Sequence, residues 1–127
     1  MIKFFGSFLW RLLPNRFRRY FSTLYLAYLQ RSIEKDTQWV VFEHNGPQLW
    51  ANLLRTIEDF LFNEWNSGAL RGNKPEQAYF VRCDRTTMTQ NDLDNGRLIC
   101  LVGVAPLKPA EFVIIRIGHW TADRKPD

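Results

Sequence analysis

The sequence has few of the residues on which enzyme and metal sites depend. It contains two cysteines, two histidines and four serines, and no serine stands in a G-x-S-x-G turn. The spacing of Cys83 and Cys100 matches neither a C-x-x-C motif nor a metal-ligand pattern. We therefore expect both to be small buried hydrophobes in a reducing compartment. No glycine-rich phosphate loop follows a strand-like segment, so we expect no cofactor and no metal.

A long hydrophobic run is also missing. The best apolar stretch, from Phe4 to Leu13, is interrupted by Arg11 and ended by Pro14, whereas a membrane span needs about 20 residues. The chain has 127 residues, of which 46% are hydrophobic and 24% are charged. These values fit one globular domain and exclude a disordered chain.

Positive charge is concentrated at the start of the chain. Residues 1–19 hold five Lys or Arg and no acidic residue, which leaves a net charge of −1 on the rest. The body therefore has no basic stripe of the kind that binds nucleic acid. Residues 1–19 are also rich in aromatic side chains. An alternative function is therefore a small protein that binds a membrane surface through this amphipathic leader, and the simpler interpretation is a segment that packs on the body or stays mobile.

The remaining residues are patterned as a small α+β domain. Apolar residues recur at steps of three and four over residues 20–35, and more strongly from Pro47 to Gly68, which predicts two helices. Short runs of β-branched and aromatic residues predict strands at 38–43, 78–83, 97–105 and 111–120. We expect a small mixed β-sheet with both helices packed on it.

A small enzyme would need its few reactive side chains to converge in one pocket. The candidates are His44, His119, Cys83 and Asp84. They are scattered over several predicted elements, and the sequence does not predict that they meet. We therefore expect no catalytic residue.

The last predicted strand is apolar on both faces. Phe112 and Ile114 point to one side, and Val113, Ile115 and Ile117 point to the other. Such a strand would aggregate as an exposed edge unless it were paired. Two interpretations stay open, namely the central strand of the domain's own sheet and a strand that pairs with a neighbouring subunit.

Several ordered blocks of the sequence resemble the C-terminal domain of contractile tail sheath proteins, which form the outer cylinder of myophage tails, R-type pyocins and related contractile injection systems. The blocks are QRSIEKDTQWVVFE (30–43), LWA (49–51), AYFVRCD (78–84), DLDNGR (92–97) and APLKPAEFVIIRI (105–117). We expect a sheath-like domain over 20–121, with its C-terminal arm strand at 110–121, a leader at 1–19 and a polar tail at 122–127. Full sheath proteins are several times longer, so the chain resembles a C-terminal fragment, a degenerate prophage product or a standalone piece.

The resemblance implies a structural protein without catalysis, whose partners are other sheath subunits and the tail tube rather than nucleic acid or membrane. It implies assembly in the host bacterial cytoplasm and a final place in a virion tail or phage-tail-like particle. The arm of the family lends a strand to an adjacent subunit. The corresponding residues are Glu111, Phe112, Val113, Ile114, Ile115, Arg116, Ile117 and Gly118.

The resemblance also implies that the domain faces the tube. The polar face of the second helix and the loop after it supply the candidate tube-facing residues, which are Arg55, Glu58, Asp59, Arg71 and Lys74. Exposed charge pairs contribute only about 0–1 kcal/mol each. Tube contacts of this kind could break during contraction while strand links between subunits hold.

Overall fold

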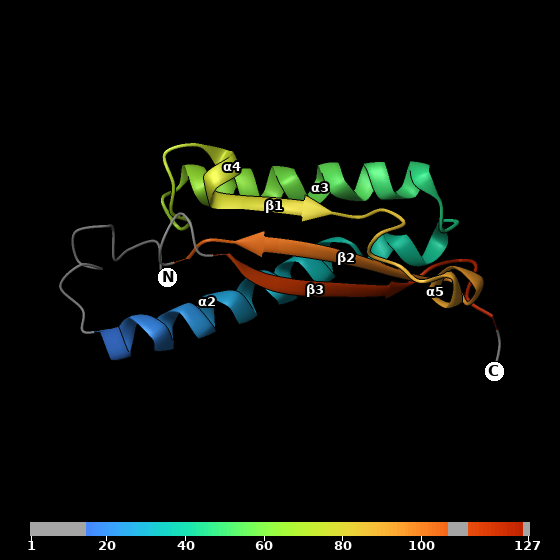
Figure 1. Cartoon of the computed structure of the whole chain (residues 1–127), viewed down its shortest axis with the longest axis horizontal. Coiled ribbons are helices and arrows are strands. Elements are labelled where there is room, and N and C mark those ends of the chain that lie inside the picture. The colour runs from blue at the N-terminus through green and yellow to red at the C-terminus, as the bar shows by residue number, and fades with distance from the viewer. Residues whose placement is uncertain (1–14, 107–111, 126–127) are drawn as a thin grey trace.

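The computed structural model describes residues 15–106 and 112–125, with side chains from residue 22 onward. In chain order the elements are α2 (Asn15–Asp36), the 3-10 helix η2 (Gln38–Phe42), α3 (Pro47–Asn66), α4 (Pro75–Ala78), β1 (Tyr79–Arg82), α5 (Gln90–Asp94), β2 (Arg97–Val104) and β3 (Val113–Trp120) (Figure 1). The predicted α+β fold is confirmed.

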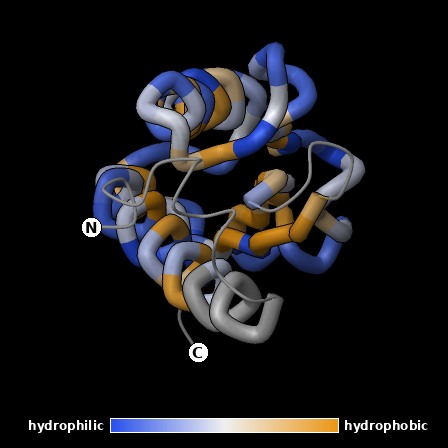
Figure 2. Tube along the Cα trace, turned by 90° about the vertical axis from the view of Figure 1, so that its left-hand side faces the viewer, coloured by the Kyte–Doolittle hydropathy of each residue, from blue (hydrophilic) through white to orange (hydrophobic). Residues whose placement is uncertain are grey.

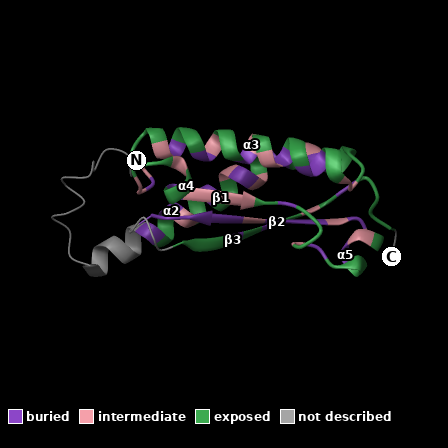
Figure 3. Cartoon of the chain, turned by 45° about the horizontal axis from the view of Figure 1, so that its top comes forward, coloured by how far each residue is buried: buried purple, intermediate pink, exposed green. Residues whose placement is uncertain are grey.

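The sheet has three antiparallel strands in the order β1-β2-β3, so β2 is central and the other two strands form the edges. Val102 of β2 pairs with Val81 on one side and with Ile115 on the other. Figure 3 shows the result: the central β2 is mostly buried, β1 is mostly intermediate and β3 is mostly exposed. Both strand pairs in the described residues are antiparallel, whereas the sequence predicted a mixed sheet.

Both long helices lie on the same side of the sheet (Figures 1 and 2). On this side β2 presents side chains that are fully buried, namely Leu98, Cys100, Val102 and Val104. The opposite side, here called the open face, has no helix of the described residues across its middle. It carries Leu101, which is half-buried, and Ile114 and Arg116, which are exposed. The described residues thus form two layers, with one sheet face on which none of their helices packs.

The two predicted helices are confirmed, and a buried carboxylate joins them. Glu64 of α3 accepts hydrogen bonds from the hydroxyls of Tyr25 (2.9 Å) and Tyr28 (3.2 Å) of α2. Burial and the neighbouring Glu64 carboxylate raise the pKa of Tyr25, so this hydroxyl stays protonated as a donor. In the described part of the chain, no helix is both long and apolar enough to cross a membrane.

α2 begins earlier than the predicted helix and includes the last residues of the predicted leader. Asn15 is its first residue, and residues 1–14 lie outside the described residues. The end of α3 matches the prediction more closely. Gly68 follows it with φ at +89°, a conformation that favours glycine, and its N–H donates to the carbonyl of Trp65 at 3.0 Å.

The predicted strand at 38–43 is wrong, because these residues form η2. Its only buried residue is Val40, while Val41 is 46% exposed and Phe42 is 82% exposed. Glu43 and Val40 close the turn with a backbone hydrogen bond of 3.0 Å. A β-branched and aromatic run of this length indicates a strand by composition, but here the segment connects two helices and pairs with no strand of the sheet.

Candidate subunit interface

β3 is the element that carries the predicted inter-subunit residues. It pairs with β2 of its own chain over its whole length, from Val113 opposite Val104 to Trp120 opposite Arg97. It is therefore an edge strand, and the interpretation as a central strand is not what the structure has. Glu111, the first residue of the predicted run, lies outside the described residues.

The two faces of β3 differ more than the sequence suggested. Ile115 and Ile117 are buried against the helices, whereas Ile114 is 53% exposed on the open face. Arg116 and Gly118 are also exposed there. Among the described residues, the hydrophobic core therefore buries only one side of the apolar run, and the other side is exposed.

Aromatic side chains cover the start of the open face. The ring of Phe80 lies over Gly103, where an added Cβ would come within 2.1 Å of the ring. Phe112 packs edge-on against Phe80, with ring centroids 5.2 Å apart. Together with Ile114 these rings form an apolar patch where β3 begins.

The far end of β3 is held by what we call the C-terminal clamp, in which residues 121–123 bind residues 43–45 and Gly96. The backbone N–H and the hydroxyl of Thr121 both donate to the carbonyl of Gly96 at 2.9 Å. Gly96 has φ at +73°, and an added Cβ would lie 2.4 Å from backbone atoms of Asp123 and Arg124. The close approach requires glycine at this position.

Asp123 makes the polar contacts of the clamp. Its carboxylate accepts hydrogen bonds from Nδ1 of His44 at 2.8 Å and from the backbone N–H of Asn45 at 2.9 Å. The bond to Asp123 raises the pKa of His44, and the bond to His44 lowers the pKa of Asp123. Because both side chains are solvent-accessible, the pair positions the end of β3 more than it stabilises the fold.

The second histidine fastens β3 to the helix layer. Nε2 of His119 lies 2.7 Å from the hydroxyl oxygen of Thr37, which itself donates to the carbonyl of Ile33 at 2.6 Å. Nε2 must therefore carry the proton and donate to Thr37. Burial lowers the pKa of His119, in keeping with a neutral ring.

The residues that a small enzyme would need do not meet. His44 and His119 have the partners just described, and Asp84 accepts from the backbone N–H of Thr86 at 2.8 Å. Cys83 is buried, and its hydrogen bond with Cys100 and its burial raise its pKa. Among the described residues no hydrogen bond or ion pair joins two of the four candidates, and no group of three acids, histidines or cysteines could hold a metal.

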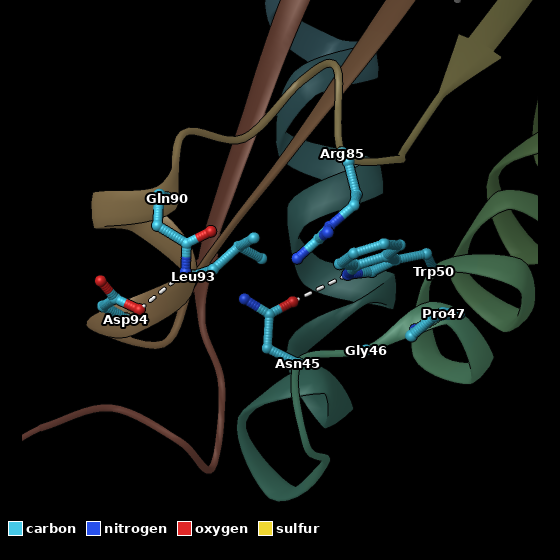
Figure 4. Close-up of a pocket in the computed structure, with 8 residues that line it drawn as sticks. All are labelled: Asn45, Gly46, Pro47, Trp50, Arg85, Gln90, Leu93 and Asp94. Carbon is cyan, nitrogen blue, oxygen red and sulfur yellow. Dashed lines mark hydrogen bonds between the residues drawn. The ribbon is translucent and has the colours of Figure 1, made fainter.

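Figure 4 shows a pocket of about 440 Å³ between α5 and the start of α3. Its polar side chains largely satisfy one another, since Nε1 of Trp50 donates to Asn45 at 2.8 Å and Gln90 donates to Asp94 at 2.9 Å. Arg85 points into the space between them. The lining residues include no histidine, cysteine or paired carboxylates, so they offer no general acid and base.

The candidate tube-facing residues fall into two groups. Arg55, Glu58 and Asp59 are exposed on the outward face of α3, and Arg71 and Lys74 lie in the connection between α3 and α4. Arg71 is half-buried, and its backbone N–H donates to the carbonyl of Ala105 at 2.9 Å.

Sequence reasoning missed one acidic residue of the same surface. Burial raises the pKa of Tyr79, and the carboxylates of Glu58, Asp59 and Glu76 raise it further. Glu76 is exposed in α4, which contacts α3, the helix that carries Glu58 and Asp59. Its place in the four-residue helix α4 was not visible in the sequence pattern.

The described residues thus present an edge strand that is held at one end and a sheet face on which no described helix packs. The chain belongs to the phage tail sheath C-terminal domain family, whose model matches residues 14–118. No curated protein matches it.

The solved structures that are similar to the chain include two of contractile particles. One is described as "Cryo-EM structure of the anti-feeding prophage (AFP) baseplate, 6-fold symmetrised", with 43% identity, a TM-score of 0.61 and coverage of 69% of this chain and 25% of that one. The other is described as "Cryo-EM Structure of an Extracellular Contractile Injection System, PVC sheath complex in contracted state", with 36% identity, a TM-score of 0.59 and coverage of 75% and 26%. The chain thus spans about a quarter of the length of the solved chains that it matches.

Proposed function

We propose that the chain is a structural subunit, or a domain of one, of a contractile phage-tail-like sheath, and that it has no catalytic role. It would assemble with other sheath subunits and reside in the tail-like particle after assembly in the bacterial cytoplasm. Family membership and the likeness to chains of two contractile particles support this role.

We further propose that subunits are linked by exchange of β3. The observation that carries this is the position of β3, which lies at the sheet edge and follows every other element. It can leave without reordering the strands and helices before it. Because every copy contains the same β2, Ile115 and Ile117 would find the same partners in a neighbouring subunit.

A two-chain disulfide experiment tests the exchange. One chain carries Val104→Cys and a second, differently tagged chain carries Val113→Cys, at positions that are partners in the β2–β3 register. Mild oxidation of the mixture joins the two tags only if β3 of one chain pairs with β2 of the other. Replacing Val113→Cys by Trp120→Cys, at the opposite end of β3, is the matched control and should give no product. Failure of the first pair to link under conditions of self-association would reject strand exchange.

The tube contact is a second part of the proposal. Arg55, Glu58 and Asp59, with Arg71 and Lys74, would bind the tail tube through charged contacts that salt weakens. Co-sedimentation of the chain with tube protein at low and high salt tests it. Charge reversal at Asp59 should reduce binding at low salt, and equal binding by the variant and the wild type would count against this surface.

Binding to a membrane surface through residues 1–19 has no support from the comparisons. Liposome flotation of the full chain against a chain without residues 1–14 separates it from the sheath role. Recovery of only the full chain with anionic vesicles would revive this alternative.

A further inference from the structure

One apolar side chain protrudes from the helix side of the domain without a cover. Phe42 is 82% exposed, and Val41 beside it is 46% exposed. Glu43 follows directly and is also exposed. We call residues 41–43 the Phe42 knob. An exposed phenylalanine next to an exposed valine is unfavourable in water and marks a contact surface more often than a lone exposed residue does.

The Phe42 knob is held in place rather than loose. Val40 just before it is fully buried, and the carbonyl of Val40 accepts from the N–H of Glu43 at 3.0 Å. The carbonyl of Glu43 in turn accepts from the N–H of Ala122 at 2.9 Å. Little conformational entropy would therefore be lost when a partner binds Phe42.

A hollow lined by apolar and basic residues, which could accept an aromatic ring and a carboxylate, lies on the open face. It has a volume of about 390 Å³ and is lined by Arg97, Leu98, Ile99, Arg116, Gly118, His119 and Trp120. Gly118 leaves it open, because an added Cβ there would meet only the carbonyl oxygen of Leu98, at 3.9 Å. We call this space the Gly118 hollow. Trp120 is 38% exposed at its edge and offers an aromatic surface.

The Gly118 hollow carries positive charge and no acidic lining residue. Arg97 is already bonded to Asp92 through Nε at 2.9 Å, whereas Arg116 has no hydrogen bond or ion pair with any described residue. The guanidinium of Arg124 lies 4.5 Å from the ring centroid of Trp120. The hollow therefore suits an apolar group that arrives together with a carboxylate.

We propose that the Phe42 knob of one copy inserts into the Gly118 hollow of a second copy, with Glu43 of the first facing Arg116 of the second. The apolar ring matches Ile99 and Trp120, and the two charges are opposite. A nucleic acid would match the arginines equally well, but residues 20–127 carry a net charge of −1, which gives no field to attract a polyanion.

The contact can form only between copies. η2 packs on the helix side of the sheet, where Thr37 just before it bonds to His119, while Arg116, Gly118 and Trp120 point to the open face. The Phe42 knob and the Gly118 hollow of one copy thus lie on opposite sides of the sheet. A knob on one side and a hollow on the other make a heterologous contact that repeats along a row of subunits.

This inference rests on the proposed sheath role, but it is independent of strand exchange. Arg116, Gly118 and Trp120 all belong to β3, so they remain together whichever copy supplies the strand. The Gly118 hollow re-forms in either case, since Ile99 belongs to β2 and the register between the strands is unchanged.

Sedimentation velocity of the full chain over a concentration series tests the contact. Phe42→Ala, Arg116→Glu, Glu43→Arg and Gly118→Val should each raise the apparent dissociation constant about tenfold or more, as expected for an aromatic anchor and its partner. Phe62→Ala, an exposed phenylalanine on α3, and Arg31→Glu, an exposed arginine on α2, are the matched controls and should leave it unchanged. Far-ultraviolet circular dichroism of each variant confirms that the fold is kept.

The charge swap makes the test specific. A chain with both Glu43→Arg and Arg116→Glu re-creates the opposite-charge pair at every contact, so it should recover most of the wild-type association. The steric block Gly118→Val should not be rescued by any charge change. The proposal is overturned if the wild type is a monomer at all concentrations, if Phe42→Ala associates like the wild type, or if the swap does not recover. Formation of the disulfide between Val104→Cys and Val113→Cys tests strand exchange separately. Strand exchange and the contact between the Phe42 knob and the Gly118 hollow can therefore be rejected independently.

Discussion

The two edges of the sheet are built differently. β1 has four residues and follows α4 directly. It also lies against α3, so both the preceding helix and the packed helix position it. β3 has eight residues and pairs only with β2, and its far end is held by the C-terminal clamp. The longer strand therefore has the longer ladder, and besides β2 it contacts α2 and η2, whereas β1 contacts α3 and α4. Under the proposed exchange, β3 would move as one unit, because its backbone hydrogen bonds in the sheet all go to β2.

The largest expected effect comes from the core side of β3. Ile117→Ala should lower the free energy of unfolding by about 2–5 kcal/mol, because a fully buried isoleucine leaves a cavity. Val81→Ala in β1 removes a half-buried side chain on the same side of the sheet and should cost less. Urea unfolding of both variants measures the difference. Equal losses would show that the two edges contribute alike.

A second prediction concerns the contact between β1 and β2. Gly103→Ala would place a Cβ 2.1 Å from the Phe80 ring, and overpacking of this kind typically costs about 1–3 kcal/mol. Gly118→Ala is the matched control on the same face, since its Cβ meets only one atom at 3.9 Å. Thermal unfolding should separate the two variants clearly. A Gly103→Ala chain as stable as Gly118→Ala would mean that Phe80 moves aside freely.

A third prediction opens the C-terminal clamp. Gly96→Ala forces a side chain into a positive-φ conformation and against residues 123 and 124, and should cost more than about 1 kcal/mol. Its signature is local. Amide hydrogen exchange should speed up in the second half of β3 and stay unchanged in β1. Uniform acceleration across the sheet would instead indicate global destabilisation without a separate clamp.

The smallest effect should come from the His44–Asp123 pair and depend on pH. The pKa of His44 is raised, so its contribution is present below the ordinary histidine pKa of about 6.5 and is lost as pH rises through the higher folded value. The pKa of Asp123 is lowered, so its contribution is present above the ordinary aspartate pKa of about 3.9 and is lost as pH falls through the lower folded value.

The clamp should therefore be tightest at mildly acidic pH, between those two ordinary values. The ratio of amide exchange at Trp120 to that at Val81 should rise from mildly acidic to alkaline pH in the wild type. Asp123→Asn should flatten this dependence, and Asp36→Asn, an exposed aspartate at the end of α2, is the matched control. A ratio that rises equally in Asp123→Asn would assign the pH effect to another group, with His119 the first to test.

Local sequence patterns predicted the two long helices. Long-range contacts determined which other segments became strands and which of their residues are exposed. The stripe of Leu53, Ile57 and Leu61 in α3 is periodic and fully buried, and such a stripe specifies its own structure. Residues 38–43 have strand-like composition but no strand partner, so tertiary context overrode local preference. The family resemblance was readable because its blocks are long and ordered along the chain.

The contacts at the candidate subunit interface could not be predicted from the sequence. His44 and Asp123 are 79 positions apart, and no local spacing predicts that they bond. Whether β3 is a central or an edge strand depends on how many strands lie beside it. Because residues 38–43 form a 3-10 helix, the sheet has one strand fewer than the sequence predicted. The exposure of Phe42 follows from the same error, because a residue of a buried strand is expected to be covered.

The order of the strands along the chain has a consequence for synthesis. β2 leaves the ribosome before β3, and at about 5–20 residues per second the two are separated by an interval of about a second. During that interval β2 has one edge without a partner, while the helices are already complete. Chains translated side by side from one message would meet in this state. The first β3 to reach that edge can belong to either chain, so the choice between a closed monomer and a linked pair would depend on local crowding at translation.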